Sequence, residues 1–169
     1  FRLQVGMRQL MEFFALHQLP ADLAVRTYKV YGESTIDLLY DDPYLLMDEG
    51  LDAPFGAVDR FAIDLGIAGD DPRRIEAGVL FELRYNLTAG HSFLPEGRLT
   101  PLTAALLECG EDPVLIAIDR LTQTERLMRD TLSNTDIIYL PRLFVSEIPA
   151  GRRTPPFSFH LYRHQQHTR

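Results

Sequence analysis

Backbone groups at a tight turn are the first candidates for chemistry in this chain. One helix is expected to end at Asp41-Asp42-Pro43, and after a tight loop a second amphipathic helix closes on Gly66. Two helices joined by a tight loop form a helix-hairpin-helix unit, which directs backbone N–H groups at a phosphate. Gly56 and Ala57, which precede the apolar stripe of the second helix, are therefore predicted to contact a nucleic-acid backbone.

Basic side chains could add charge to such a contact, because lysine and arginine neutralise phosphates. Six of them fall on expected helices or on an expected β-hairpin, and each is a predicted phosphate contact: Arg26, Lys29, Arg60, Arg120, Arg126 and Arg129. The last three are ranked first, because they lie on a helix and a hairpin of the kind that dock on DNA.

The charge distribution limits this binding. The net charge is −7, and residues 33–72 contain eleven acidic residues but a single basic one, Arg60. Residues 149–169 contain four arginines and no acidic residue. Because the acidic middle repels DNA on average, any contact is expected to be weak and local.

Other groupings of polar residues favour plainer interpretations. The acidic residues within 41–52 match no calcium loop and predict a solvated face. His160, His164 and His167 have a spacing that could bind zinc on a helix, but the preceding prolines favour a loosely held basic tail. Lys29 lacks the glycines of a phosphate-binding P-loop, so ATP hydrolysis by that route is not expected. No catalytic residue, metal ligand or cofactor is predicted within this chain.

The elements that must position these residues are mostly helices. Apolar periodicity and Pro or Gly punctuation predict helices over about 6–17, 21–31, 34–42, 58–66, 72–89, 100–109 and 113–123. Thr100-Pro101 and Asp112-Pro113 are interpreted as helix starts. A short extended piece at 91–95 and a β-hairpin from Arg126 to Leu140, turning at Ser133-Asn134-Thr135, complete the pattern.

The predicted fold class is mainly α, with a tandem helix-hairpin-helix region at 1–70 and a winged-helix-like unit with a small β-hairpin at 71–148. An irregular basic tail is expected at 149–169. The start at Phe1 indicates a piece of a longer protein. The lone Cys109 fits a reducing, cytoplasmic compartment, and no membrane span is expected.

Several short segments, in this order and spacing, resemble the accessory region of RecD-like ATP-dependent DNA helicases: residues 23–32, 42–44, 57–67, 71–75, 90–95 and 138–141. The resemblance runs from about Met7 to Ile148. It implies a DNA-binding accessory region that precedes the motor of a 5′–3′ helicase. It also implies single-stranded or forked DNA and the parent's motor domains as partners, with ATP and Mg used only by the motor.

The second hairpin departs from the family pattern. Asp52, Ala53 and Pro54 stand where the family commonly has glycine, a hydrophobic residue and glycine, and Gly56 replaces a frequent basic residue. Asp52 places a negative charge near a phosphate, and Pro54 removes an N–H donor. These substitutions favour a reduced affinity for DNA. Two alternatives therefore stay open: a protein–protein scaffold and a stand-alone winged-helix regulator.

Overall fold

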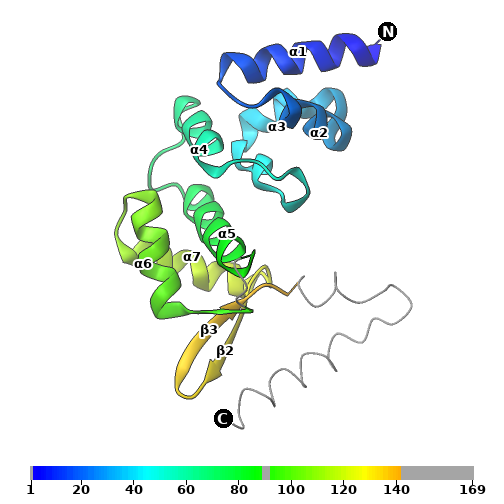
Figure 1. Ribbon diagram of the computed structural model, residues 1–169. Helices are drawn as coiled ribbons and strands as arrows, with labels where there is room; N and C mark the ends of the chain where they lie inside the picture. The colour runs from blue at the N-terminus through cyan, green and yellow to red at the C-terminus, as the bar shows by residue number, and fades with distance from the viewer. Residues whose placement is uncertain (1, 89–91, 142–169) are drawn as a thin grey trace, which may run out of the picture. The chain divides into compact units, whose positions relative to one another are not determined.

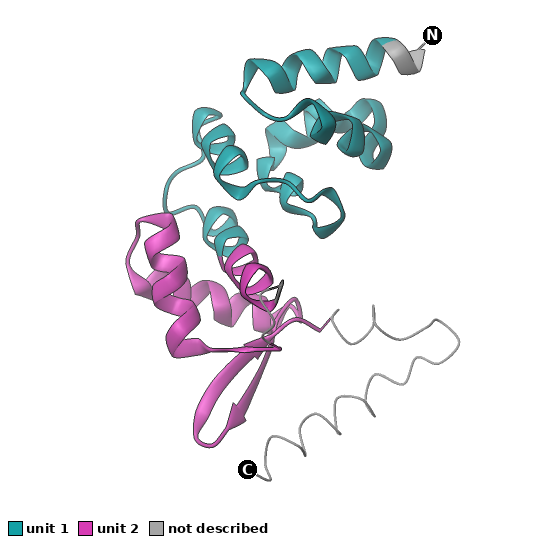
Figure 2. Ribbon diagram, viewed as in Figure 1, with its two compact units in different colours: residues 1–78 teal, residues 79–169 magenta. Residues whose placement is uncertain are grey.

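The computed structural model describes residues 2–88 and 92–141 (Figure 1). The chain divides into two compact units, residues 1–78 and 79–169, and the division falls inside one helix (Figure 2). The sequence places a domain boundary at 70/71, just before that helix. The basic tail expected at 149–169, with its three histidines, lies outside the described residues.

Unit 1 is built from helices separated by short turns. α1 (Arg2–Leu16), α2 (Ala21–Tyr31), η1 (Gly32–Ser34) and α3 (Thr35–Asp41) come first. Two 3₁₀ turns, η2 (Pro43–Met47) and η3 (Glu49–Leu51), then lead to α4 (Phe55–Asp64). The first part of α5 (Pro72–Thr88) completes the unit. The tandem helix-hairpin-helix prediction is confirmed, and short 3₁₀ turns precede the second hairpin.

Proline and glycine set the ends of these elements, as expected from the sequence. Pro20 is the N-cap residue of α2, and Gly32 ends that helix with a φ of 66°, a value that glycine adopts without steric cost. Pro43 begins η2, where the Asp42 carboxylate accepts the Tyr44 N–H at 3.0 Å. These stops make the chain reverse at each hairpin.

The core of unit 1 lies between α1, α2, α3 and α4. Leu10 and Phe14 from α1 are buried with Leu23 from α2 and Phe61 from α4. Phe61 has no exposed surface, whereas Leu65, just past the end of α4 at Asp64, is half-buried.

Unit 2 has the element order predicted for a winged-helix-like unit. The end of α5 precedes β1 (Leu94–Pro95), α6 (Glu96–Leu107), α7 (Glu111–Gln123), β2 (Met128–Leu132) and β3 (Thr135–Tyr139). The strands form an antiparallel sheet in the order β1-β3-β2 (Figure 1). The residues described are mainly α-helical, as predicted, and none of their helices is long and apolar enough to cross a membrane.

Two local details of unit 2 differ from the sequence prediction. α6 begins at Glu96 and includes Pro101, so the helix start predicted at Thr100-Pro101 is wrong. The missing N–H of Pro101 removes one helical hydrogen bond, which this helix tolerates near its N-terminal end. The hairpin turn contains two residues, not three, because Thr135 pairs with Leu132 and only Ser133 and Asn134 have positive φ values, 50° and 62°.

Candidate nucleic-acid interface

The second hairpin keeps a tight turn although it lacks the family glycines. Asp52 adopts the left-handed conformation, with φ 49° and ψ 48°. Aspartate tolerates this region better than most residues, so it can replace glycine at the turn. The side chain is exposed, and the negative charge expected from the sequence is therefore present beside the start of α4.

Gly56 and Ala57 lie in the first turn of α4. The first helical bond of α4 runs from the Val58 N–H to the Pro54 carbonyl oxygen at 3.2 Å, so the N–H groups of Gly56 and Ala57 precede the helical ladder. Pro54, at the N-cap, contributes no side-chain cap. Gly56 is exposed, and a Cβ atom added to it would meet open space. The helix dipole adds partial positive charge at this end.

Arg60 is the basic residue closest to this turn along α4. It is exposed, and its Nη1 atom lies 3.4 Å from Oε1 of Gln18. This long contact leaves the guanidinium accessible to an anion. Gly56, Ala57 and Arg60 are therefore carried by one short helix, which begins earlier than the 58–66 predicted from the sequence.

A buried cluster holds α4 in place. The Nε and Nη2 atoms of Arg74 donate to the two carboxylate oxygens of Asp59 at 2.9 and 3.0 Å. The Tyr44 hydroxyl donates to Asp59 at 2.6 Å. The side chains of Arg74 and Asp59 are only 9% and 14% exposed. We call these three residues the clamp, because they join η2, α4 and α5 by charge-assisted hydrogen bonds.

Arg73 makes a second connection beside the clamp. It forms a two-pronged ion pair with Asp71 at 3.0 and 2.9 Å, and its Nη1 atom donates to the Asp41 carbonyl oxygen at 2.7 Å. Hydrogen bonding from Arg73 lowers the pKa of Asp71. Three of the segments that carry the family resemblance therefore contact one another at and beside the clamp: residues 42–44, 57–67 and 71–75. The sequence indicated these segments but did not predict the contacts between them.

The two basic candidates on α2 differ in their surroundings. Arg26 is half-buried, where its Nε atom donates to the Leu51 carbonyl oxygen at 2.9 Å and Nη1 pairs with Asp22 at 2.8 Å. It thus ties α2 to the residue just before the Asp52 turn. Lys29 is exposed.

In unit 2, the candidates on α7 and on the hairpin are not equally accessible. Arg129 is half-buried, and its Nη2 atom donates to Glu96 on α6 and, at 2.7 Å, to Asp119 on α7. Arg120 and Arg126 are exposed. The positive charge of Arg129 is therefore balanced within the protein, which the sequence did not predict.

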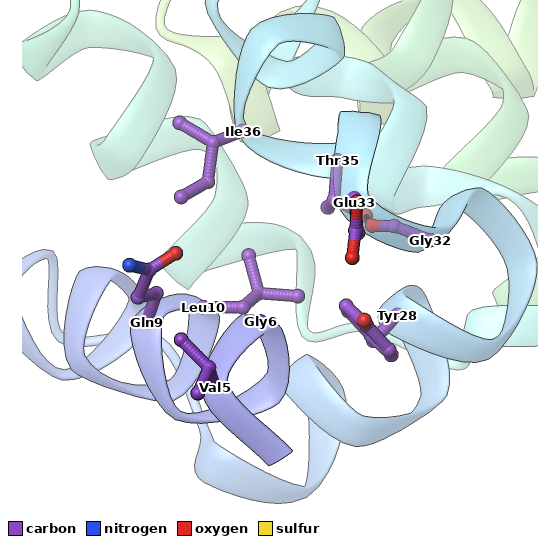
Figure 3. A pocket seen from close by; sticks show the side chains of 9 residues that line it. All are labelled: Val5, Gly6, Gln9, Leu10, Tyr28, Gly32, Glu33, Thr35 and Ile36. Atoms are coloured by element: carbon purple, nitrogen blue, oxygen red, sulfur yellow. Dashed lines mark hydrogen bonds between the residues drawn. The ribbon is translucent and has the colours of Figure 1, made fainter. Parts of the chain in front are cut away.

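An open pocket of about 380 Å³ lies elsewhere in unit 1, between α1, α2 and η1 (Figure 3). Val5, Leu10, Tyr28 and Glu33 are among its lining residues, and none of the predicted phosphate contacts lines it. Within residues 2–88 and 92–141, no group of three or more histidine, cysteine or carboxylate side chains could hold a metal ion.

The tight turn at Asp52, the exposed start of α4 and the mainly α fold are features of a helix-hairpin-helix protein. Residues 3–93 match the family model of the HHH domain of the ATP-dependent RecD2 DNA helicase, and the chain belongs to this family. It is also 29% identical over 140 residues to the ATP-dependent RecD2 DNA helicase of Deinococcus radiodurans. That alignment covers 76% of this chain and 19% of the relative, so the chain corresponds to a small part of the relative's length.

Proposed function

We propose that this chain is a DNA-binding accessory region of a RecD2-type helicase, which guides or braces single-stranded or forked DNA for a motor. The family match carries the helicase assignment. The turn at Asp52 and the exposed first turn of α4 support the DNA contact, because the N–H groups of Gly56 and Ala57 precede the helical ladder at the positive end of the helix dipole.

Within this proposal, Gly56 and Ala57 donate backbone N–H groups to one phosphate, and Arg60 pairs with a neighbouring phosphate. Lys29 is an additional exposed cation, whereas Arg26 supports the turn through the Leu51 carbonyl oxygen. Arg120 and Arg126 are the exposed candidate phosphate contacts in unit 2. Arg129 is ranked last, because DNA would have to compete with two carboxylates for it. The acidic surroundings predict weak affinity.

Substitutions at Gly56 separate folding from binding. There is open space at this position, so Gly56→Ala and Gly56→Asp should both fold, and an acidic residue in the first turn also suits the helix dipole. Gly56→Asp places a negative charge where the phosphate is proposed to bind. We expect Gly56→Ala to bind a fluorescently labelled dT oligonucleotide or fork like the parent chain, and Gly56→Asp to bind more weakly with an unchanged or raised melting temperature.

The salt dependence of the same anisotropy titration tests the charge contact. Arg60→Ala should reduce the slope of log affinity against log salt by about 0.7 on single-stranded DNA, the value for one lost phosphate contact. If Gly56→Asp and Arg60→Ala both bind like the parent chain, the hairpin is not the contact. If the parent chain binds no form of DNA at low salt, the DNA-binding proposal fails.

A second candidate function is a protein–protein scaffold, and the surface of α7 favours it. Leu115 and Ile116 are exposed on this helix beside Asp112 and Asp119, and Arg120 is the nearby exposed cation. An apolar and acidic helix face suits a protein partner, such as the parent's motor domains, better than a DNA groove. The same surface argues against a stand-alone winged-helix regulator. If neither the parent chain nor any variant binds DNA at any salt concentration, the scaffold is favoured.

A further inference from the structure

Four aromatic rings meet on unit 1 at a place that sequence spacing does not reveal. Phe13 and His17 come from α1, Tyr40 from α3 and Phe61 from α4. The ring centroid of Phe13 lies 4.8 Å from that of His17, 5.7 Å from that of Tyr40 and 5.9 Å from that of Phe61. The centroids of His17 and Phe61 are 5.0 Å apart. We call this group the aromatic cluster.

Burial within the aromatic cluster is graded. Phe61 is fully buried and forms its base, Phe13 and His17 are half-buried, and Tyr40 is 58% exposed. The rings contact one another edge to face, with interplanar angles between 60° and 89°. Such contacts stabilise aromatic pairs and fix their orientation. The exposed ring of Tyr40 therefore packs against Phe13, which in turn contacts His17 and Phe61.

A cation lies at the edge of the aromatic cluster. Arg60 directly precedes Phe61, and its Nη1 atom contacts Gln18, which directly follows His17. The exposed acidic residues Asp37, Asp41 and Asp64 lie near Tyr40 or Arg60 along the same helices. These carboxylates disfavour the approach of a duplex with two charged strands. Their repulsion matters less for one unpaired base, because the contact of a base with a ring does not depend on phosphate charge.

We propose that the aromatic cluster is a stacking platform for an unpaired nucleobase, with Tyr40 as the outermost ring and Arg60 beside the adjoining phosphate. This inference rests on the proposed DNA-binding function and specifies the ligand as single-stranded nucleic acid. The platform is tolerant of sequence, because every base has a π-face. Bases within a duplex are already stacked on their neighbours and are not available to it.

A comparison of two oligonucleotides tests the stacking contact without changing the phosphate contacts. One is a dT oligonucleotide, and the other has the same length and backbone but abasic sites in place of the bases. Tyr40→Ala should reduce the affinity for dT about five-fold or more, which corresponds to the loss of one stacked base. It should leave the affinity for the abasic strand unchanged. Tyr85→Ala is the matched control, because Tyr85 is 66% exposed and lies outside the aromatic cluster, with the Phe81 ring as a neighbour at 6.1 Å.

A fluorescent reporter provides a second measurement that does not rely on a loss of binding. The chain contains no tryptophan, so Tyr40→Trp introduces a single indole into the aromatic cluster. This variant should keep or increase the affinity for dT, and its emission should be quenched by dT but not by the abasic strand. Tyr85→Trp should not be quenched by either strand.

The outcomes separate this inference from the proposed function. If the parent chain and Tyr40→Ala bind dT equally, and Tyr40→Trp is not quenched, the stacking platform is wrong while DNA binding through the hairpin stands. If the parent chain binds neither strand, the proposed DNA-binding function fails and the platform fails with it. A loss confined to dT for Tyr40→Ala, together with quenching of Tyr40→Trp, supports the platform.

Discussion

Replacement of Asp59 by asparagine should strongly destabilise unit 1, because it removes the only charge in the clamp that balances Arg74. The Asp59 carboxylate accepts hydrogen bonds from Tyr44 and from two nitrogen atoms of Arg74. Both ionic side chains are nearly buried, at 9% and 14% exposure, so water cannot take over the role of the lost partner. Breaking a buried ion pair on one side costs about 3–5 kcal/mol.

The lower part of that range applies to Asp59→Asn, since the amide oxygen can still accept a hydrogen bond. A loss of about 3 kcal/mol is a large share of the 5–15 kcal/mol by which a domain is typically stable. For a domain of 60–100 residues it corresponds to a fall in melting temperature of about 12–24 °C. Thermal melts and urea titrations followed by circular dichroism would measure both quantities.

Two further variants make the result interpretable. Asp22→Asn removes an ion pair with Arg26 in which the Asp22 side chain is 75% exposed, and its melting temperature should stay close to that of the parent chain. The double replacement of Asp59 by Asn and Arg74 by Met removes the uncompensated charge, so it should be less destabilised than Asp59→Asn alone. If Asp59→Asn has the same melting temperature as Asp22→Asn, the clamp does not hold α4.

Three other changes test separate parts of the structure. Asp52→Gly removes an exposed carboxylate from a left-handed turn that glycine adopts freely, so DNA affinity measured by anisotropy should rise; weaker binding would contradict the repulsion argument. Burial, aided by the hydrogen bond to a carboxylate, raises the pKa of Tyr44 above its ordinary value of 10. The stability that the neutral hydroxyl contributes is therefore fully present below pH 10 and is lost as the pH rises further. Between pH 9 and 11, the urea midpoint of Tyr44→Phe should therefore fall less than that of the parent chain. Arg129→Ala should lower the melting temperature because two carboxylates lose their partner, whereas Arg126→Ala should leave it unchanged; the reverse order would show that Arg129 is not structural.

The order of elements was predictable, because local signals set most of their ends. Apolar periodicity identified the helices, and Gly32 and Pro43 stop or start elements where the sequence indicated. The prediction failed at Pro101, since a proline in the interior of a helix and a proline at its first turn look alike in sequence. An interior proline loses one helical hydrogen bond and crowds the carbonyl group four residues earlier, and α6 accommodates both effects.

The site was less predictable than the fold, because its side chains are paired over long sequence separations. Glu96 lies 33 residues from Arg129, so nothing in the local pattern shows that this arginine is neutralised. Asp59 and Arg74 are 15 residues apart and meet only when α4 and α5 fold together. By contrast, the turn at Asp42-Pro43 was predicted, since it depends on local residues.

The most direct test of the central claim is to map the backbone amides that respond to DNA. Two-dimensional ¹H–¹⁵N NMR spectra of the chain, recorded during titration with a dT oligonucleotide at low and at moderate salt, would report each N–H group separately. The proposed function predicts that the amides of Gly56 and Ala57 shift at low salt, together with their neighbours in residues 52–60, and that the shifts diminish as salt is added. Shifts confined to residues 111–135 of unit 2, or no shifts at any salt concentration, would contradict the claim that the second hairpin binds DNA.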